Sequence, residues 1–152
     1  MNKRSFLEIS FASLIPFALA RPSVAREIIS AYRNPGCGCC EKWADMMMAA
    51  GFVVNMKDDD DLAARRTAAG VPEDLAGCHT AMAGNYVIEG HVPLTDIERL
   101  LAEKPAIRGI AVPGMPMGSP GMEMGESRDA YDVVAFKADG TRSVFASYVA
   151  RP

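Results

Sequence analysis

Residues 31–43 read AYRNPGCGCCEKW, and this stretch decides which fold is expected. It places three of the chain's four cysteines, Cys37, Cys39 and Cys40, within four positions. An apolar run rich in β-branched residues comes before the motif, the turn residues 34–36 interrupt that run, and helix-forming residues follow. The sequence therefore predicts that the cysteines lie where a first strand ends and a helix begins.

The rest of the chain alternates between strand and helix patterns. The predicted elements are a strand at 27–33, a helix at 39–51, a strand at 52–57, a helix at 58–70, two short strands within 78–92 and a helix at 93–104. This order, with a cysteine motif at the end of the first strand, predicts an α/β fold: a thioredoxin-like sheet with helices on both faces.

Two further segments follow that unit. Residues 107–127 read IRGIAVPGMPMGSPGMEMGES and are predicted to form a loop rich in Met, Pro and Gly. Residues 131–149 read YDVVAFKADGTRSVFASYV, with a turn at 138–140, which predicts a C-terminal β-hairpin.

The first 25 residues are predicted to be an export signal peptide. They begin with the basic pair Lys3 and Arg4, continue with an apolar stretch at 6–19 and end in small residues. The start also resembles a twin-arginine signal with Lys in place of the first Arg, so the Sec and twin-arginine routes both stay open. Residues 26–152 are then one periplasmic domain without a membrane span. A net charge of −3 and the lack of a basic block argue against a nucleic-acid partner.

The clustered cysteines support two kinds of chemistry. Cys37 and Cys40 have the spacing of thiol oxidoreductases, and a helix N-terminus lowers the pKa of a thiol. Cys39 is a third soft ligand that dithiol exchange does not require. Adjacent Cys39 and Cys40 are hard to aim at one tetrahedral zinc, whereas a thiolate-bridged Cu(I) cluster accommodates them. A plain disulfide with bystander thiols is the remaining alternative.

Further ligands are expected near the second pair of strands. In a thioredoxin-like sheet the loop that enters the third strand lies against the first helix, so Cys78 is predicted to be the fourth thiolate. His79 offers an imidazole, but consecutive strand residues face opposite ways, and only one of the two is expected to point easily at the site. His91 follows VIEG in a turn and is expected to be a solvated histidine.

The methionines form two groups with different predicted roles. A thioether binds Cu(I) without losing a proton, and the Pro/Gly-rich loop has no period that would build a core. Its four methionines are therefore candidate metal ligands, with a plain linker as the alternative: Met115, Met117, Met122 and Met124. The run at 46–48 lies within a helical apolar pattern and is expected in the core.

Four segments resemble the family of metal-binding proteins that includes the copper-resistance protein CopG. They run in order through NPGCGCCEKWADMMMAAGF at 34–52, GVPEDLAGCHTAMAGNYVIEGHVP at 70–93, AIRGIAVPGMPMGSPGME at 106–123 and YDVVAF at 131–136. The resemblance implies a periplasmic thioredoxin-like domain with a role in copper redox cycling during resistance. It also implies a copper site whose ligands are Cys37, Cys39, Cys40 and Cys78, with a methionine loop that matches the family's own.

Three functions remain open at this point. The chain is a copper-binding protein of copper resistance that also cycles the ion between oxidation states, a thiol–disulfide oxidoreductase using Cys37 and Cys40, or a copper chaperone. Oxidoreductases of this fold usually present a cis-proline beside the dithiol, and the corresponding stretch at 78–82 reads CHTAM, without proline. The partners implied are copper ions, other periplasmic copper-handling proteins or an efflux system.

Overall fold

The computed structural model describes residues 27–152, so the predicted export signal at 1–25 lies outside the described residues. The described elements, in chain order, are β1 (Ile28–Arg33), α1 (Gly38–Ala49), β2 (Val53–Asp58), α2 (Leu62–Ala69), the short 3-10 helix η1 (Glu73–Leu75), β3 (His79–Ala83), β4 (Tyr86–Glu89), α3 (Leu94–Glu103), β5 (Gly109–Ala111), β6 (Tyr131–Phe136) and β7 (Arg142–Tyr148). Among these helices, none has the length and apolar character that a membrane crossing requires.

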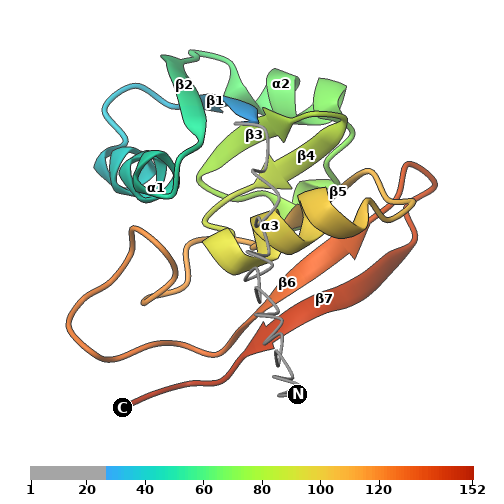
Figure 1. Cartoon of the computed structure of the whole chain (residues 1–152). Helices are drawn as coiled ribbons and strands as arrows, with labels where there is room; N and C mark the ends of the chain where they lie inside the picture. Colours follow the sequence, from blue (N-terminus) through green and yellow to red (C-terminus); the bar gives the residue numbers. More distant parts are fainter. Residues whose placement is uncertain (1–26) are drawn as a thin grey trace, which may run out of the picture.

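The strands form one mixed sheet in the order β2-β1-β3-β4-β5-β6-β7 (Figure 1). β1 runs parallel to β2, and β4 runs parallel to β5, whereas the other neighbours are antiparallel. Three helices accompany this sheet, and the predicted thioredoxin-like α/β fold is confirmed.

Helices cover both faces of the sheet, as the sequence predicted. Trp43 of α1 and Leu100 of α3 pack in one core with Ile88 and Ile110 of the sheet. The neighbouring residues of the same strands point the other way and pack in a second core near the end of α2: Val87, Ala111 and Phe136 lie there with Val71 and Leu75. This alternation follows from the two-residue period of a strand.

Two expectations need correction. Residues 109–111 were expected to belong to the loop but form β5, which pairs with β4 on one side and β6 on the other. The predicted hairpin of β6 and β7 is therefore an extension of the main sheet. Of the three methionines at 46–48, only Met47 is buried, because successive helical residues point about 100° apart and one of the three faces the sheet.

Candidate metal centre

The four cysteines meet where α1 begins and β3 begins. Cys37 is the N-cap of α1, Cys39 and Cys40 lie in its first turn, and Cys78 directly precedes β3. The antiparallel pairing of β1 with β3 places Arg33 opposite His79, so the segments that follow β1 and precede β3 lie side by side. The topology therefore brings together cysteines that are about forty residues apart in the chain.

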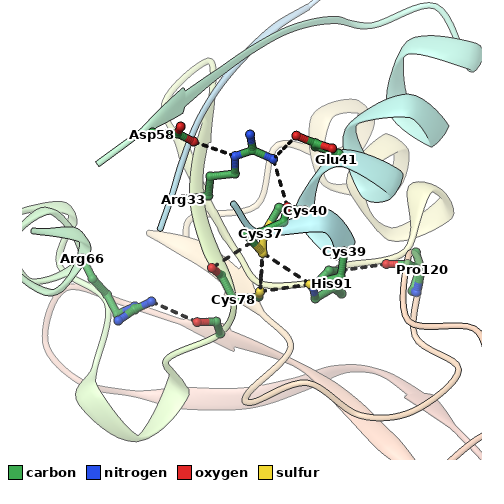
Figure 2. Close-up of a disulfide and its surroundings, with 11 residues drawn as sticks. Arg33, Cys37, Cys39, Cys40, Glu41, Asp58, Arg66, Cys78, His91 and Pro120 are labelled. Carbon is green, nitrogen blue, oxygen red and sulfur yellow. Dashed lines mark hydrogen bonds and ion pairs between the residues drawn. A yellow bond between two sulfur atoms is a disulfide. The ribbon is translucent and has the colours of Figure 1, made fainter. Parts of the chain in front are cut away.

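The cysteine sulfurs form a compact group. The Cys78 Sγ atom lies 3.1 Å from that of Cys37 and 3.3 Å from those of Cys39 and Cys40, and all four sulfurs lie within 4.8 Å of one another. Cys37 and Cys40 are joined by a disulfide, whereas Cys39 and Cys78 are free thiols (Figure 2). The structure thus shows an oxidised form of the site, and two electrons with two protons would return it to four thiols.

Arg33 fixes the start of α1 against the end of β1. Its guanidinium donates to the Cys37 carbonyl at 2.9 Å and to Asp58 at 2.8 Å, and it pairs with Glu41 at 2.8 Å (Figure 2). Cys37 makes no side-chain cap to the helix, so its sulfur stays available to the cluster. Hydrogen bonds to the two carboxylates, Asp58 first, raise the pKa of Arg33.

Two histidines extend the cysteine cluster into the protein interior. The ligand atoms of Cys40, His79 and His91 lie within 4.8 Å of one another, and all three residues are buried. The His79 ring stacks at a tilt on Trp43, with centroids 4.3 Å apart, and meets His91 edge-on at 5.1 Å. His79 and Cys78 therefore both reach the site, because Cys78 precedes the strand and the alternation of strand residues does not separate them.

The expectation that His91 is solvated was wrong, since its side chain is fully buried. Its Nδ1 atom lies 2.7 Å from the Pro120 carbonyl oxygen (Figure 2). A carbonyl only accepts hydrogen bonds, so Nδ1 carries the proton and Nε2 keeps its lone pair. The sequence around residue 91 could not predict this burial, because the partner is 29 residues further along the chain. The one local hint in the sequence is that His91 lies beside apolar residues, with Val87 and Ile88 before it and Val92 after it.

Three of the four nitrogens of these two imidazoles lack partners within the described residues. Both nitrogens of His79 and Nε2 of His91 accept or donate no hydrogen bond there. A buried polar atom left unsatisfied costs about 1–3 kcal/mol, so it calls for an explanation. Neutral imidazole beside thiolate is a donor set that suits Cu(I). A bound metal would take the lone pair of one nitrogen on each ring, and the other His79 nitrogen, which carries the proton, would still need an acceptor.

Burial controls the charge of these groups. It lowers the pKa of His79 to about 3, with His91 and Arg66 adding to the effect, and it also lowers the pKa of His91. Both imidazoles are therefore neutral near pH 7, which is the form that binds metals. Burial and the neighbouring Cys39 raise the pKa of the Cys78 thiol to about 12, so metal binding must release its proton.

The methionine-rich loop between β5 and β6 reaches back to this site, as its orange trace beside α1 shows (Figure 1). Gly121 adopts a φ of +87°, and a Cβ there would lie 2.6 Å from the Cys39 carbonyl oxygen and 3.0 Å from the Trp43 nitrogen. Only glycine fits such an approach. Pro120 and Gly121 thus bring the loop into direct contact with the site.

The four methionines of the loop differ in exposure. Met115 and Met124 are 57% and 73% exposed, whereas Met117 and Met122 are half-buried. The backbone around them is ordered by turns, with the Gly118 nitrogen donating to the Met122 carbonyl at 2.9 Å. The structure therefore places the four methionines in the loop that contacts the cluster through Pro120 and Gly121, and two of their thioethers are exposed.

The chain is similar to two solved structures, titled "Copper resistance protein copG- Form 2" and "Copper resistance protein copG- Form 1". Each is 43% identical to this chain, with a TM-score of 0.77; the matches cover 80% of this chain and 98% or 97% of the solved chains. Residues 75–122 match a family model described as "Protein of unknown function, DUF411". No curated protein matches the chain. A likeness of this identity over nearly the whole of the solved chains shows that the chain belongs to the family of the copper resistance protein CopG.

Proposed function

We propose that this chain is an exported, periplasmic protein of copper resistance that holds Cu(I) in a site of more than one ion. The observation that carries the proposal is the meeting of four cysteine sulfurs, within 4.8 Å of one another, with buried imidazole nitrogens that have no partner among the described residues. The family to which the chain belongs supports copper as the metal.

The donor set favours copper over zinc and over hard cations. Thiolate and imidazole are soft or borderline ligands, whereas calcium and magnesium require oxygen. Cys40 belongs to both the four-cysteine group and the histidine group, so it is placed to bridge two ions. One tetrahedral zinc would leave either the fourth cysteine or both histidines unused.

Copper titration of the reduced chain tests this proposal. The protein is reduced without oxygen, loaded with Cu(I) in the presence of a competing chelator, and analysed for bound metal, with a parallel zinc titration as the control. We expect more than one copper per chain, and we expect Cys78→Ser to lose at least one of them. One zinc per chain with no retained copper would reject the proposal.

A second candidate function is thiol–disulfide exchange, and the Cys37–Cys40 disulfide at the start of α1 favours it. A dithiol of this spacing accepts or donates two electrons as the disulfide opens or closes. On closing to the disulfide, the same two thiols would release two protons and two electrons, enough to reduce two Cu(II) ions to Cu(I), which would combine both functions in a copper-cycling protein.

Replacing Cys39 by Ser separates the two candidates. A dithiol enzyme keeps Cys37 and Cys40 and should reduce disulfides of insulin at the wild-type rate, whereas a copper cluster loses a bridging sulfur. We expect Cys39→Ser to bind fewer copper ions than the parent. Unchanged copper stoichiometry, together with loss of insulin reduction in Cys37→Ser, would favour the oxidoreductase.

A further inference from the structure

A buried carboxylate accepts hydrogen bonds from the segment that carries Cys78. Glu89, at the end of β4, is fully buried and lies opposite Thr80 in the pairing of β3 with β4. Its Oε1 atom accepts from the Gly77 backbone nitrogen at 2.8 Å, and its Oε2 atom accepts from the Thr80 hydroxyl at 2.6 Å. The carboxylate thus bridges the residues on either side of the pair Cys78 and His79.

Arg66 of α2 also binds this segment, and it pairs with Glu89. Its Nε atom donates to Glu89 Oε1 at 2.6 Å, and its NH2 group donates to the Gly77 carbonyl at 2.9 Å. Arg66 lies at the left of Figure 2, reaching toward the segment that carries Cys78. The Gly77 nitrogen is held by the carboxylate and the Gly77 carbonyl by the guanidinium. The peptide group that leads into Cys78 is therefore fixed in position and orientation.

Close backbone packing leaves this segment little room to shift. A Cβ at Gly77 would lie 2.5 Å from the Gly90 Cα, so the two backbones touch. The Gly90 nitrogen donates to the His79 carbonyl at 2.8 Å, and the Gly114 nitrogen donates to the Ala76 carbonyl at 2.8 Å. The same segment thus also sets the start of the methionine-rich loop.

We infer that Glu89, with Arg66, is the positioning residue that holds Cys78 in the metal centre. A buried ion pair is costly to desolvate, and this one is offset by hydrogen bonds to the backbone next to a candidate ligand. The network touches none of the four sulfurs directly, so it acts through the peptide group of Gly77. The effect of Glu89 on copper binding rests on the proposed copper site. Its effect on the position of Cys78 does not depend on any metal.

The geometrical part is tested in the metal-free, reduced chain. Glu89→Ala removes the acceptor for the Gly77 nitrogen, and we expect the alkylation rate of Cys78 to rise about tenfold as the segment loosens. The matched control is Asp96→Ala, because Asp96 is also a buried carboxylate but bonds Tyr148, at 2.6 Å, away from the cysteines. Equal Cys78 rates in Glu89→Ala and Asp96→Ala would overturn the inference.

The consequence for metal is tested by a double-mutant cycle. Glu89→Ala and Cys78→Ser should each weaken Cu(I) retention, and their combination should lose no more than Cys78→Ser alone, because both act through one ligand. Additive losses would overturn the inference. If Cys78→Ser itself retains copper like the parent, the proposed site fails, while the alkylation result still decides the role of Glu89.

Two milder variants keep the test decisive if Glu89→Ala does not fold. Glu89→Gln keeps an oxygen for the Gly77 nitrogen and Arg66, so we expect parental copper binding and Cys78 reactivity. Thr80→Val removes only the hydroxyl that bonds Oε2, and we expect a smaller rise in Cys78 alkylation than Glu89→Ala gives. Parental Cys78 reactivity in Thr80→Val, or a rise in Glu89→Gln as large as in the alanine variant, would overturn the positioning role.

Discussion

At the scale of single residues, the two buried histidines link the stability of the metal-free chain to pH. His79 is fully buried against Trp43 and His91, and burial lowers its pKa from 6.5 to about 3. The unfolded chain binds a proton on this residue below about pH 6.5, but the folded chain does not until about pH 3. The free energy of unfolding is therefore highest above pH 6.5 and falls as the pH decreases toward 3.

This linkage gives a measurable pH dependence. Between pH 7 and pH 5, His79 alone should reduce the free energy of unfolding of the metal-free, reduced chain by about 2 kcal/mol. Urea unfolding at the two pH values measures the loss. His79→Phe keeps a planar ring without a titrating group and should lose most of this dependence. A variant with the same pH dependence as the parent would show that other groups cause it.

At the scale of elements, the loop between β5 and β6 has two packed residues in its middle and exposed methionine side chains on either side of them. Pro120 and Gly121 are fixed against His91 and α1, whereas the side chains of Met115 and Met124 are largely exposed. We predict that the thioethers on both sides of residues 120 and 121 pass Cu(I) to or from the thiolates, because this transfer changes ligand softness little.

Replacing all four loop methionines, at 115, 117, 122 and 124, by leucine tests this role. Leucine keeps the size and apolar character of the side chain, so the free energy of unfolding of the metal-free chain should change little. Cu(I) affinity, or the rate of transfer to a chelator, should fall by about tenfold. A variant that binds and releases copper like the parent would identify the loop as a linker.

The elements that could be predicted from the sequence are those whose ends are marked by residues within the element or next to it. Asp61 caps the N-terminus of α2, where its side chain accepts from the Ala64 nitrogen at 3.1 Å, and Gly70 caps the C-terminus with a φ of +80°. β5 has only three residues and too short a pattern to show a period, and its pairing with β4 and β6 is visible only in the fold. His91 likewise depends on Pro120, which no spacing near residue 91 reveals.

At the scale of the whole molecule, a metal in this site would tie together segments that are distant in the chain. The cysteines at the start of α1 and Cys78 are separated by 38 to 41 residues. Residues 120 and 121, from a third segment, pack against His91 and the start of α1. The cysteine spacing predicted a site at the first segment, and the expected thioredoxin-like topology added Cys78 to it. The pairing of β1 with β3 brings the two segments together.

Cu(I) should therefore stabilise the folded chain as a whole. A ligand at 100 times its Kd adds about 2.7 kcal/mol to the free energy of unfolding, which should raise the Tm by roughly 10 °C for a domain of this size. Calorimetry of the reduced chain with and without Cu(I), under exclusion of oxygen, measures the shift. Cys78→Ser should show a much smaller rise. An equal rise in both proteins would mean that copper does not bridge α1 and β3.

The backbone contacts at Gly77, Gly90 and Gly121 bear on the rate of electron exchange at the proposed copper site as well as on its affinity for copper. At each of these positions a Cβ would lie within 2.6 Å of another backbone atom, so main chain packs on main chain with no side chain between that could rearrange. In the proposed copper site, ligands carried by such segments would keep their places when the charge of the ion changes. Little atomic motion would then accompany the gain or loss of an electron, which would favour fast electron exchange.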